Sequence, residues 1–171
     1  LLAFVVYPLL WNIRFSVYEY DGFTKSFNGL YNFKRVLTDP MWWKAVANTF
    51  IFTIFKTVIM FPIAIVLAVI LNGDLRGRNF IRAAYFTPYI ISMAIASMIF
   101  IIMFSGYNGI VNEILKSLGI IRENVEWLGS ESTAMGVVVA VNIWKDLGYN
   151  ILLVLAGLQS IPRELYESAA I

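Results

Sequence analysis

Four long apolar segments constrain this chain of 171 residues more than any other feature of its sequence. They occupy approximately residues 1–18, 47–71, 83–104 and 133–157, and the third contains no charged residue. About 20 mostly apolar residues are enough for a helix to cross a bilayer core of roughly 30 Å. We therefore predict an all-α, polytopic helical membrane protein with four transmembrane helices.

The composition supports this prediction, because 60% of the residues are hydrophobic and only 14% are charged. Soluble domains carry about 25% charged residues, and a soluble chain of this length has too little interior for so many apolar side chains. The excess must face lipid or other membrane helices. The net charge of +2, carried on scattered basic residues, excludes a nucleic-acid partner from the expected functions.

Cysteine and histidine are both absent from the sequence. This absence excludes zinc sites built on thiolate or imidazole, Cys–His and Ser–His nucleophile pairs, and disulfides. On these grounds an enzyme that uses only Ser, Thr, Lys, Asp or Glu remains open.

The ends of the chain fall inside structural patterns. Leu1 lies within an apolar run and Ile171 within a helical pattern, so we expect a fragment truncated at both ends. Residues 1–13 resemble the apolar region of a signal peptide, but no small-residue cleavage site follows them, which favours a truncated first span.

The distribution of basic residues predicts the orientation. Arg76, Arg78 and Arg82 lie in the short connection 72–84, whereas the loops 19–47 and 105–132 hold six Lys or Arg in 57 residues. The positive-inside rule then places 72–84, and with it both ends of the chain, in the cytoplasm.

Both longer loops are predicted to contain helices. Asp39 followed by Pro40 is typical of a helix start, with Trp42 and Trp43 at the membrane interface. In the second loop, apolar residues recur on one face and Gly119 follows as a C-cap, which predicts an amphipathic surface helix. The residues of that face are Ile110, Val111, Ile114, Leu115 and Leu118.

The fourth apolar segment carries a polar face. At about 100° per residue, five polar residues fall within an arc of roughly 140°; they are Asn142, Lys145, Asp146, Tyr149 and Asn150. A charged group at the bilayer centre costs roughly 2.5–3.5 kcal/mol, so Lys145 and Asp146 each need a partner on another element. The face is interpreted either as a buried cluster that joins helices or as the lining of a translocation path. We favour the path, because five polar groups exceed what packing requires.

Lys56 shares a helical face with Thr49 and Thr53 in the second apolar segment. It lies about 12 Å below Asn48 at 1.5 Å per residue. We therefore expect its long side chain to reach the outer surface, and we interpret Arg14 in the same way.

Residues 161–171 are predicted to begin a new helix, with Pro162 in its first turn. Its polar side carries Glu164 and Glu167 beside one arginine. Helices on a membrane surface usually have a basic polar side, so docking to another protein is favoured.

Several motifs along the chain resemble those of permease subunits of bacterial ABC sugar importers, the maltose and multiple-sugar class. The motifs are Tyr7-Pro8-Leu9, Gly29-Leu30-Tyr31-Asn32-Phe33, Leu75-Arg76-Gly77-Arg78-Asn79-Phe80-Ile81-Arg82 leading to Thr87-Pro88, Trp144-Lys145-Asp146-Leu147-Gly148-Tyr149-Asn150, and Leu155-Ala156-Gly157-Leu158-Gln159-Ser160-Ile161-Pro162. The ending Glu164-Leu165-Tyr166-Glu167-Ser168-Ala169-Ala170-Ile171 resembles the start of the EAA loop of that family.

The resemblance implies that residues 1–171 form one permease domain, part of a six-helix core. It implies that Glu164, Leu165, Tyr166, Glu167, Ser168, Ala169 and Ala170 couple the permease to a cytoplasmic ATPase. Glu167 stands at the glutamate of the motif and Ala169 at its second alanine, whereas Ser168 replaces the first alanine.

The resemblance also implies an assembly in the bacterial cytoplasmic membrane. The expected partners are a second homologous permease, an ABC ATPase dimer, an extracytoplasmic solute-binding protein, a sugar substrate and the lipid bilayer. The chain itself would catalyse no reaction and bind no cofactor or metal, since ATP and Mg²⁺ would be bound by the ATPase.

Three other interpretations remain open at this point. A stand-alone secondary transporter or channel explains the apolar segments and the polar face, but leaves the acidic docking helix unexplained. A membrane-embedded enzyme would have to use Lys145 or Asp146 as a base, and a purely structural subunit would need neither.

Overall fold

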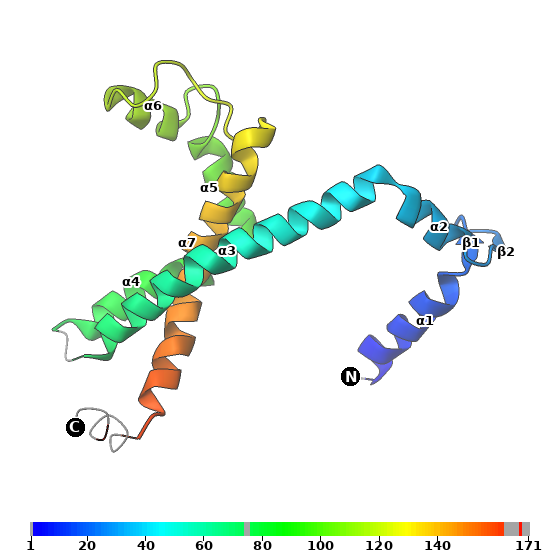
Figure 1. The fold of residues 1–171 in the computed structure, drawn as a ribbon, viewed down its shortest axis with the longest axis horizontal. Coiled ribbons are helices and arrows are strands. Elements are labelled where there is room, and N and C mark those ends of the chain that lie inside the picture. Colours follow the sequence, from blue (N-terminus) through cyan, green and yellow to red (C-terminus); the bar gives the residue numbers. More distant parts are fainter. Residues whose placement is uncertain (1, 74–75, 163–167, 169–171) are drawn as a thin grey trace. The chain divides into compact units, whose positions relative to one another are not determined.

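The computed structural model describes residues 2–73, 76–162 and 168. The chain forms two compact units, Leu1–Ile51 and Phe52–Ile171, which are treated separately (Figure 1). Helix α3 (Pro40–Asn72) begins in the first unit and continues into the second. The described chain is mostly helical, as predicted.

The first unit contains short elements. They are η1 (Leu2–Val6), a π-helix, α1 (Tyr7–Phe15), β1 (Tyr18–Tyr20), β2 (Lys25–Phe27) and α2 (Tyr31–Thr38). The apolar helix ends at Phe15, so the segment predicted as a span over 1–18 provides a helix shorter than a bilayer core requires.

The hairpin β1–β2 is an exception to the predicted all-α architecture. Its strands are antiparallel, with Tyr18 opposite Phe27, and are three residues long, too short for a clear alternating pattern. The Asp21 carboxylate accepts hydrogen bonds from the Thr24 amide and hydroxyl and from the Phe23 amide, at 2.6–2.9 Å. The Thr24 amide contributes most to lowering the pKa of Asp21 to about 2, so this turn keeps its charge at neutral pH.

The predicted start of α3 is confirmed. The Asp39 carboxylate accepts a hydrogen bond from the Met41 amide at 2.8 Å, and Pro40 is the first helical residue. Trp43 donates its indole N–H to the Leu37 carbonyl at 2.8 Å. The helix therefore begins seven residues before the segment predicted as a span, because the cap residues determine its start.

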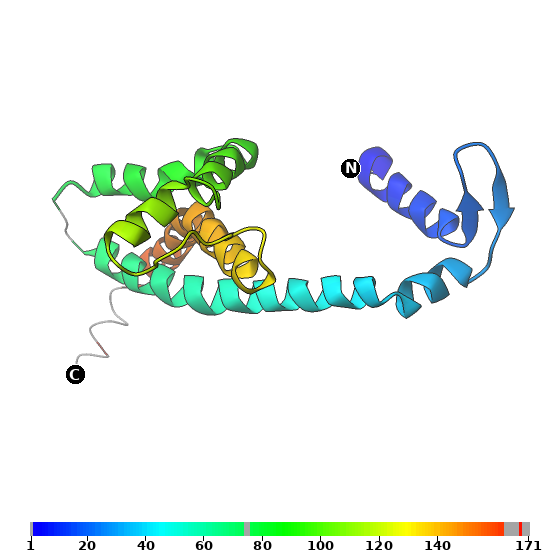
Figure 2. The same ribbon diagram turned by 90° about the horizontal axis from the view of Figure 1, so that it is seen from above.

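In the second unit, α7 lies between α3 on one side and α4 and α5 on the other (Figure 2). The further elements are α4 (Arg78–Ile90), α5 (Met93–Met103), α6 (Ile110–Ser117) and α7 (Glu131–Gln159). Among the described residues, α3 and α7 are long and apolar enough to cross a membrane, and α4 with α5 makes a third candidate if the bent pair is one span.

The span predicted over 83–104 is divided into two helices. Helices α4 and α5 meet at an angle of 91°, and leave their junction in different directions in Figure 1. Ile91 and Ser92 between them have extended backbones, with ψ angles of 132° and 137°. The break leaves backbone carbonyl groups that α7 binds, as described below. The apolar sequence of 83–104 does not predict it, because those bonds come from a distant segment.

Small residues allow α3 and α7 to pack closely. Ala64 and Ala68 of α3 are fully buried, and they pack with Leu71 against Ile151 and Leu155 of α7. This cluster is the main buried core of the described chain and fixes the lateral position of α7 against α3.

The amphipathic helix predicted in the second loop is confirmed as α6. Gly119 follows it with a φ of +70°, and the Ile120 amide donates to the Leu115 carbonyl at 2.9 Å, as in a glycine C-cap. Ile110, Ile114 and Leu118 are more than half exposed. Val111 and Leu115 are half-buried, so the described chain covers the apolar side of α6 only in part.

Asn112, on the other side of α6, is the residue that holds this loop together. It is fully buried, and its amide group makes four hydrogen bonds. The nitrogen donates to the carbonyls of Ser105 and Val125, and the oxygen accepts from the Val125 amide and the Trp127 indole, all at 2.9–3.1 Å.

We expect Asn112→Ala to destabilise the loop 105–130 by about 2 kcal/mol, because half-buried donors on Val125 and Trp127 lose their acceptor. Limited proteolysis of the full-length protein in detergent should then cleave within this loop. Glu123→Ala is a suitable control in the same loop, because Glu123 is exposed and lies outside α6. Equal protease resistance in both variants would contradict the role given to Asn112.

Candidate functional site

The predicted polar face of α7 is divided between two neighbouring elements. Asp146 and Asn150 face α3, whereas Lys145 and Tyr149 face α4. The division follows from the helical period, because residues four apart lie above one another on the same helix face. Asp146 and Asn150 form one such pair, and Lys145 and Tyr149 form the other.

Asp146 forms an ion pair with Lys56 across the interface of α7 and α3. The Lys56 Nζ lies 2.6 Å from Asp146 Oδ2, and the two side chains are 19% and 31% exposed. The prediction that Lys56 reaches the outer surface is therefore wrong. An opposite charge on the neighbouring helix outweighs the gain from solvation at the surface, because attraction is strong where water is scarce.

Asn150 extends the contact with α3 by one turn. Its side-chain nitrogen lies 3.5 Å from Met60 Sδ and donates to the Asp146 carbonyl at 2.9 Å. Met60 lies four residues after Lys56, and Asn150 lies four residues after Asp146. Helices α3 and α7 therefore run in the same direction.

Lys145 binds the break between α4 and α5. Its Nζ donates to the carbonyls of Tyr89 at 3.0 Å and Ile91 at 2.9 Å. Tyr149, one turn further along α7, stacks on the Tyr89 ring, with centroids 4.8 Å apart and planes 12° apart. The prediction that Lys145 and Asp146 have separate partners on other elements is thus confirmed.

Gly148 allows α4 and α7 to approach each other closely. A Cβ atom at this position would lie 2.0 Å from the Tyr85 carbonyl oxygen and 3.1 Å from the Phe86 Cα. Sequence reasoning did not single out Gly148, although a glycine inside a membrane helix commonly marks a close helix contact.

Asn142 is separated from the other four polar residues. Its side-chain nitrogen donates to the Val138 carbonyl of its own helix at 2.9 Å. It also lines a pocket of about 260 Å³ between α5 and α7, together with Met93 and Ser97. Within the described residues, the five predicted polar residues do not converge on one cavity, and their role in a translocation path stays a prediction.

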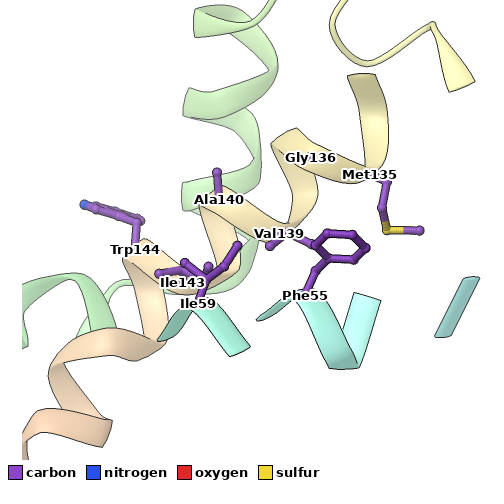
Figure 3. Close-up of a pocket in the computed structure, with 8 residues that line it drawn as sticks. All are labelled: Phe55, Ile59, Met135, Gly136, Val139, Ala140, Ile143 and Trp144. Atoms are coloured by element: carbon purple, nitrogen blue, oxygen red, sulfur yellow. The ribbon is translucent and has the colours of Figure 1, made fainter. Parts of the chain in front are cut away.

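The largest pocket described lies between α3 and α7 and has a volume of about 670 Å³ (Figure 3). Its lining consists of Phe55, Ile59, Met135, Gly136, Val139, Ala140, Ile143 and Trp144. The indole of Trp144 supplies the one polar side-chain atom, and Figure 3 shows this ring at the opposite end from Phe55. Such a lining suits lipid chains or another apolar helix, because a sugar needs several polar groups to bind its hydroxyls.

The described residues contain no group of three acidic side chains that could hold a metal ion. The predicted coupling residues Glu164, Leu165, Tyr166, Glu167, Ala169 and Ala170 lie outside the described residues. Ser168 is described as helical and exposed, which leaves its coupling role a prediction.

No family model matches the chain. The chain is, however, similar along 99% of its length to curated transport proteins. It is 37% identical to the lactose transport system permease protein LacF of Rhizobium radiobacter and covers 57% of that protein. It is 35% identical to the arabinooligosaccharides transport system permease protein AraP of Bacillus subtilis (strain 168), covering 54%, and 33% identical to the trehalose/maltose transport system permease protein MalF of Thermococcus litoralis, covering 58%.

A solved structure has the same fold. It is a bacterial ABC transporter involved in the import of the acidic polysaccharide alginate, with a TM-score of 0.80, 24% identity, and coverage of 99% of this chain and 57% of that one. The chain thus spans a little over half the length of the relatives it matches.

Proposed function

The chain is homologous to permease proteins of ABC sugar transporters, and we propose that it is part of the permease subunit of an ATP-driven carbohydrate importer. The observation that carries this proposal is the 37% identity to a lactose permease protein along 99% of the chain. The substrate class follows from the relatives, whose names include lactose, arabinooligosaccharides and trehalose or maltose.

The proposed partners are a second permease, an ABC ATPase dimer and an extracytoplasmic solute-binding protein. A related alginate transporter has been crystallised with a periplasmic protein that carries an alginate pentasaccharide, which supports a binding-protein partner. We assign ATP hydrolysis to that ATPase, since the relatives of this chain are named as permease proteins of transport systems.

The parallel course of α3 and α7 supports the proposed orientation. Because the two helices run in the same direction, the turn after α3 and the end of α7 lie at the same end of the second unit. The turn and the start of α4 carry Arg76, Arg78 and Arg82, so the positive-inside rule predicts a cytoplasmic position for this end. The residues after Gln159 would then meet a cytoplasmic ATPase.

The test uses the full-length permease with its partners in proteoliposomes. We expect sugar uptake to require both ATP and the binding protein. Uptake driven by an ion gradient without ATP would overturn the proposal in favour of a stand-alone secondary transporter or channel.

A photo-crosslinking residue at Ser168 tests the coupling part of the proposal in native membranes. We expect it to capture the ATPase, whereas the same residue at Phe23 should not. Phe23 is 97% exposed and lies in the hairpin, within the loop 19–47 that the positive-inside rule predicts to be outside the cytoplasm. Capture of the ATPase at neither site would contradict the coupling role.

A further inference from the structure

The break between α4 and α5 exposes backbone carbonyl groups in an apolar part of the chain. The last four carbonyls of any α-helix have no partner within the helix, and an unsatisfied backbone group in a bilayer costs several kcal/mol. Ile91 and Ser92 are extended, and the Ser92 carbonyl accepts the first bond of α5 from the Ala96 amide at 3.0 Å, which leaves the carbonyls at the end of α4 to be bound. The bend can therefore persist only if donors on another element bind these oxygens.

Lys145 supplies those donors from the middle of α7. Its ammonium group has three N–H donors, and two of them bind the Tyr89 and Ile91 carbonyls at 3.0 and 2.9 Å. Its charge lies at the C-terminal end of α4, where the helix dipole favours a cation. It also lies 5.5 Å from the centre of the Tyr89 ring, within the range of a cation–π contact.

Lys145 does not neutralise Asp146, its neighbour in the sequence. Asp146 is the one acidic residue in the apolar stretches 52–72, 80–103 and 133–157, and Lys56 already binds it at 2.6 Å. In broken helices of other membrane transporters, unwound carbonyls of this kind coordinate a bound Na⁺ or H⁺. Here a cation that belongs to the chain occupies the equivalent position.

We propose that Lys145 is a positioning residue, whose ammonium group acts as an intrinsic cation that holds the bend between α4 and α5 and joins it to α7. The Tyr89–Tyr149 stack and the close approach at Gly148 lie on the same two turns of α7. Helix α7 and the bent pair therefore move as one body. This inference goes beyond the proposed function, because it concerns how the bend is maintained, whatever is transported.

The test measures the bend directly. Spin labels are attached at Phe80→Cys on α4 and Ile102→Cys on α5, since both side chains are largely exposed, at 80% and 66%, and the chain has no cysteine of its own. Electron–electron distance measurements are made on the full-length complex in lipid nanodiscs. The variants are Lys145→Met, Lys145→Arg and, as matched control, the double variant Lys56→Met with Asp146→Leu, which removes the other intramembrane lysine without leaving an unpaired charge.

The native complex, Lys145→Arg and the double variant Lys56→Met with Asp146→Leu should each give one narrow distance distribution at the same position. Lys145→Met should give a broader distribution with a shifted maximum. A distribution as narrow as the native one, at the native position, would overturn the proposal. If Lys145→Met does not assemble, recovery of the complex is compared for Lys145→Arg and Lys145→Gln. If the complex is recovered with Lys145→Arg but not with Lys145→Gln, the result supports a requirement for a cation at this position. Equal recovery of the two variants, or failure of both to assemble, would contradict the proposal.

Transport kinetics separate positioning from sugar binding. In the assembled complex, Lys145→Met should lower the maximal rate of uptake about tenfold or more, the factor expected when hydrogen bonds from a charged donor are lost. The KM for the sugar should stay at the native value, because Lys145 binds backbone carbonyls. A raised KM with an unchanged maximal rate would assign Lys145 to the sugar path and overturn the proposal. The distance measurement needs no transport, so failure of the proposed function would leave it unaffected.

Discussion

Gly148→Ala should remove most of the correctly assembled protein, because the added methyl group would lie 2.0 Å from the Tyr85 carbonyl oxygen. That oxygen belongs to the backbone of α4, so the clash cannot be relieved by turning a side chain. Overpacking of this kind typically costs about 1–3 kcal/mol and sometimes more. Helix α4 would have to move away from α7, which would also lengthen the bonds from Lys145 to the break.

Helix α7 contains its own controls for this substitution. Gly136 and Gly157 lie on the same helix, and a Cβ atom at either position would have no atom within 4 Å. Gly136→Ala and Gly157→Ala should therefore leave the melting temperature in detergent unchanged or slightly raised, whereas Gly148→Ala should lower it. Equal melting temperatures for the three variants would show that α4 and α7 do not approach as closely as described.

The second large effect concerns the ion pair between α3 and α7. Asp146→Ala leaves the Lys56 ammonium group without its counter-charge in an apolar interface. Removal of one partner of a buried pair costs about 3–5 kcal/mol. We expect about 3 kcal/mol, because 19% of the Lys56 side chain and 31% of the Asp146 side chain remain exposed.

The double variant Lys56→Met with Asp146→Leu should recover most of this loss, since no unpaired charge remains in the interface. Glu113→Ala is the matched control, because Glu113 forms a surface pair with Lys116 at the same distance of 2.6 Å. That substitution should cost no more than about 0.5 kcal/mol. If the double variant is as unstable as Asp146→Ala, the pair is not the source of the effect.

Features that depend on neighbouring residues were predicted from the sequence. The start of α3 at Asp39 and Pro40, and the end of α6 at Gly119, follow from caps within a few residues of the helix terminus. The need of Lys145 and Asp146 for separate partners follows from the cost of charge in a membrane and from their positions on the helix. Each of these predictions uses only local geometry and solvation.

Features that depend on distant residues were not predicted. The partner of Lys56 lies 90 residues away, and Lys145 is separated by 54 residues from the Ile91 carbonyl it binds. Hydropathy and periodicity describe one segment at a time, so they predict a continuous helix over 83–104 and a lysine that reaches the surface. The role of Asn112 was not predicted for the same reason. Its side-chain oxygen accepts hydrogen bonds from Val125 and Trp127, which only the folded loop brings close to it.

The sequence interval between Lys56 and Asp146 has a consequence for the synthesis of the protein. Translation at about 5–20 residues per second takes about 5–18 s to add the 90 residues that separate them. During that time Lys56 is present in the nascent chain without its counter-charge, and its long side chain has to reach water at the membrane surface. Helix α3 is apolar enough to insert alone, but its contact with α7 can form only after Asp146 has been synthesised. A stall in translation between Lys56 and Asp146 would prolong the time for which Lys56 has no counter-charge.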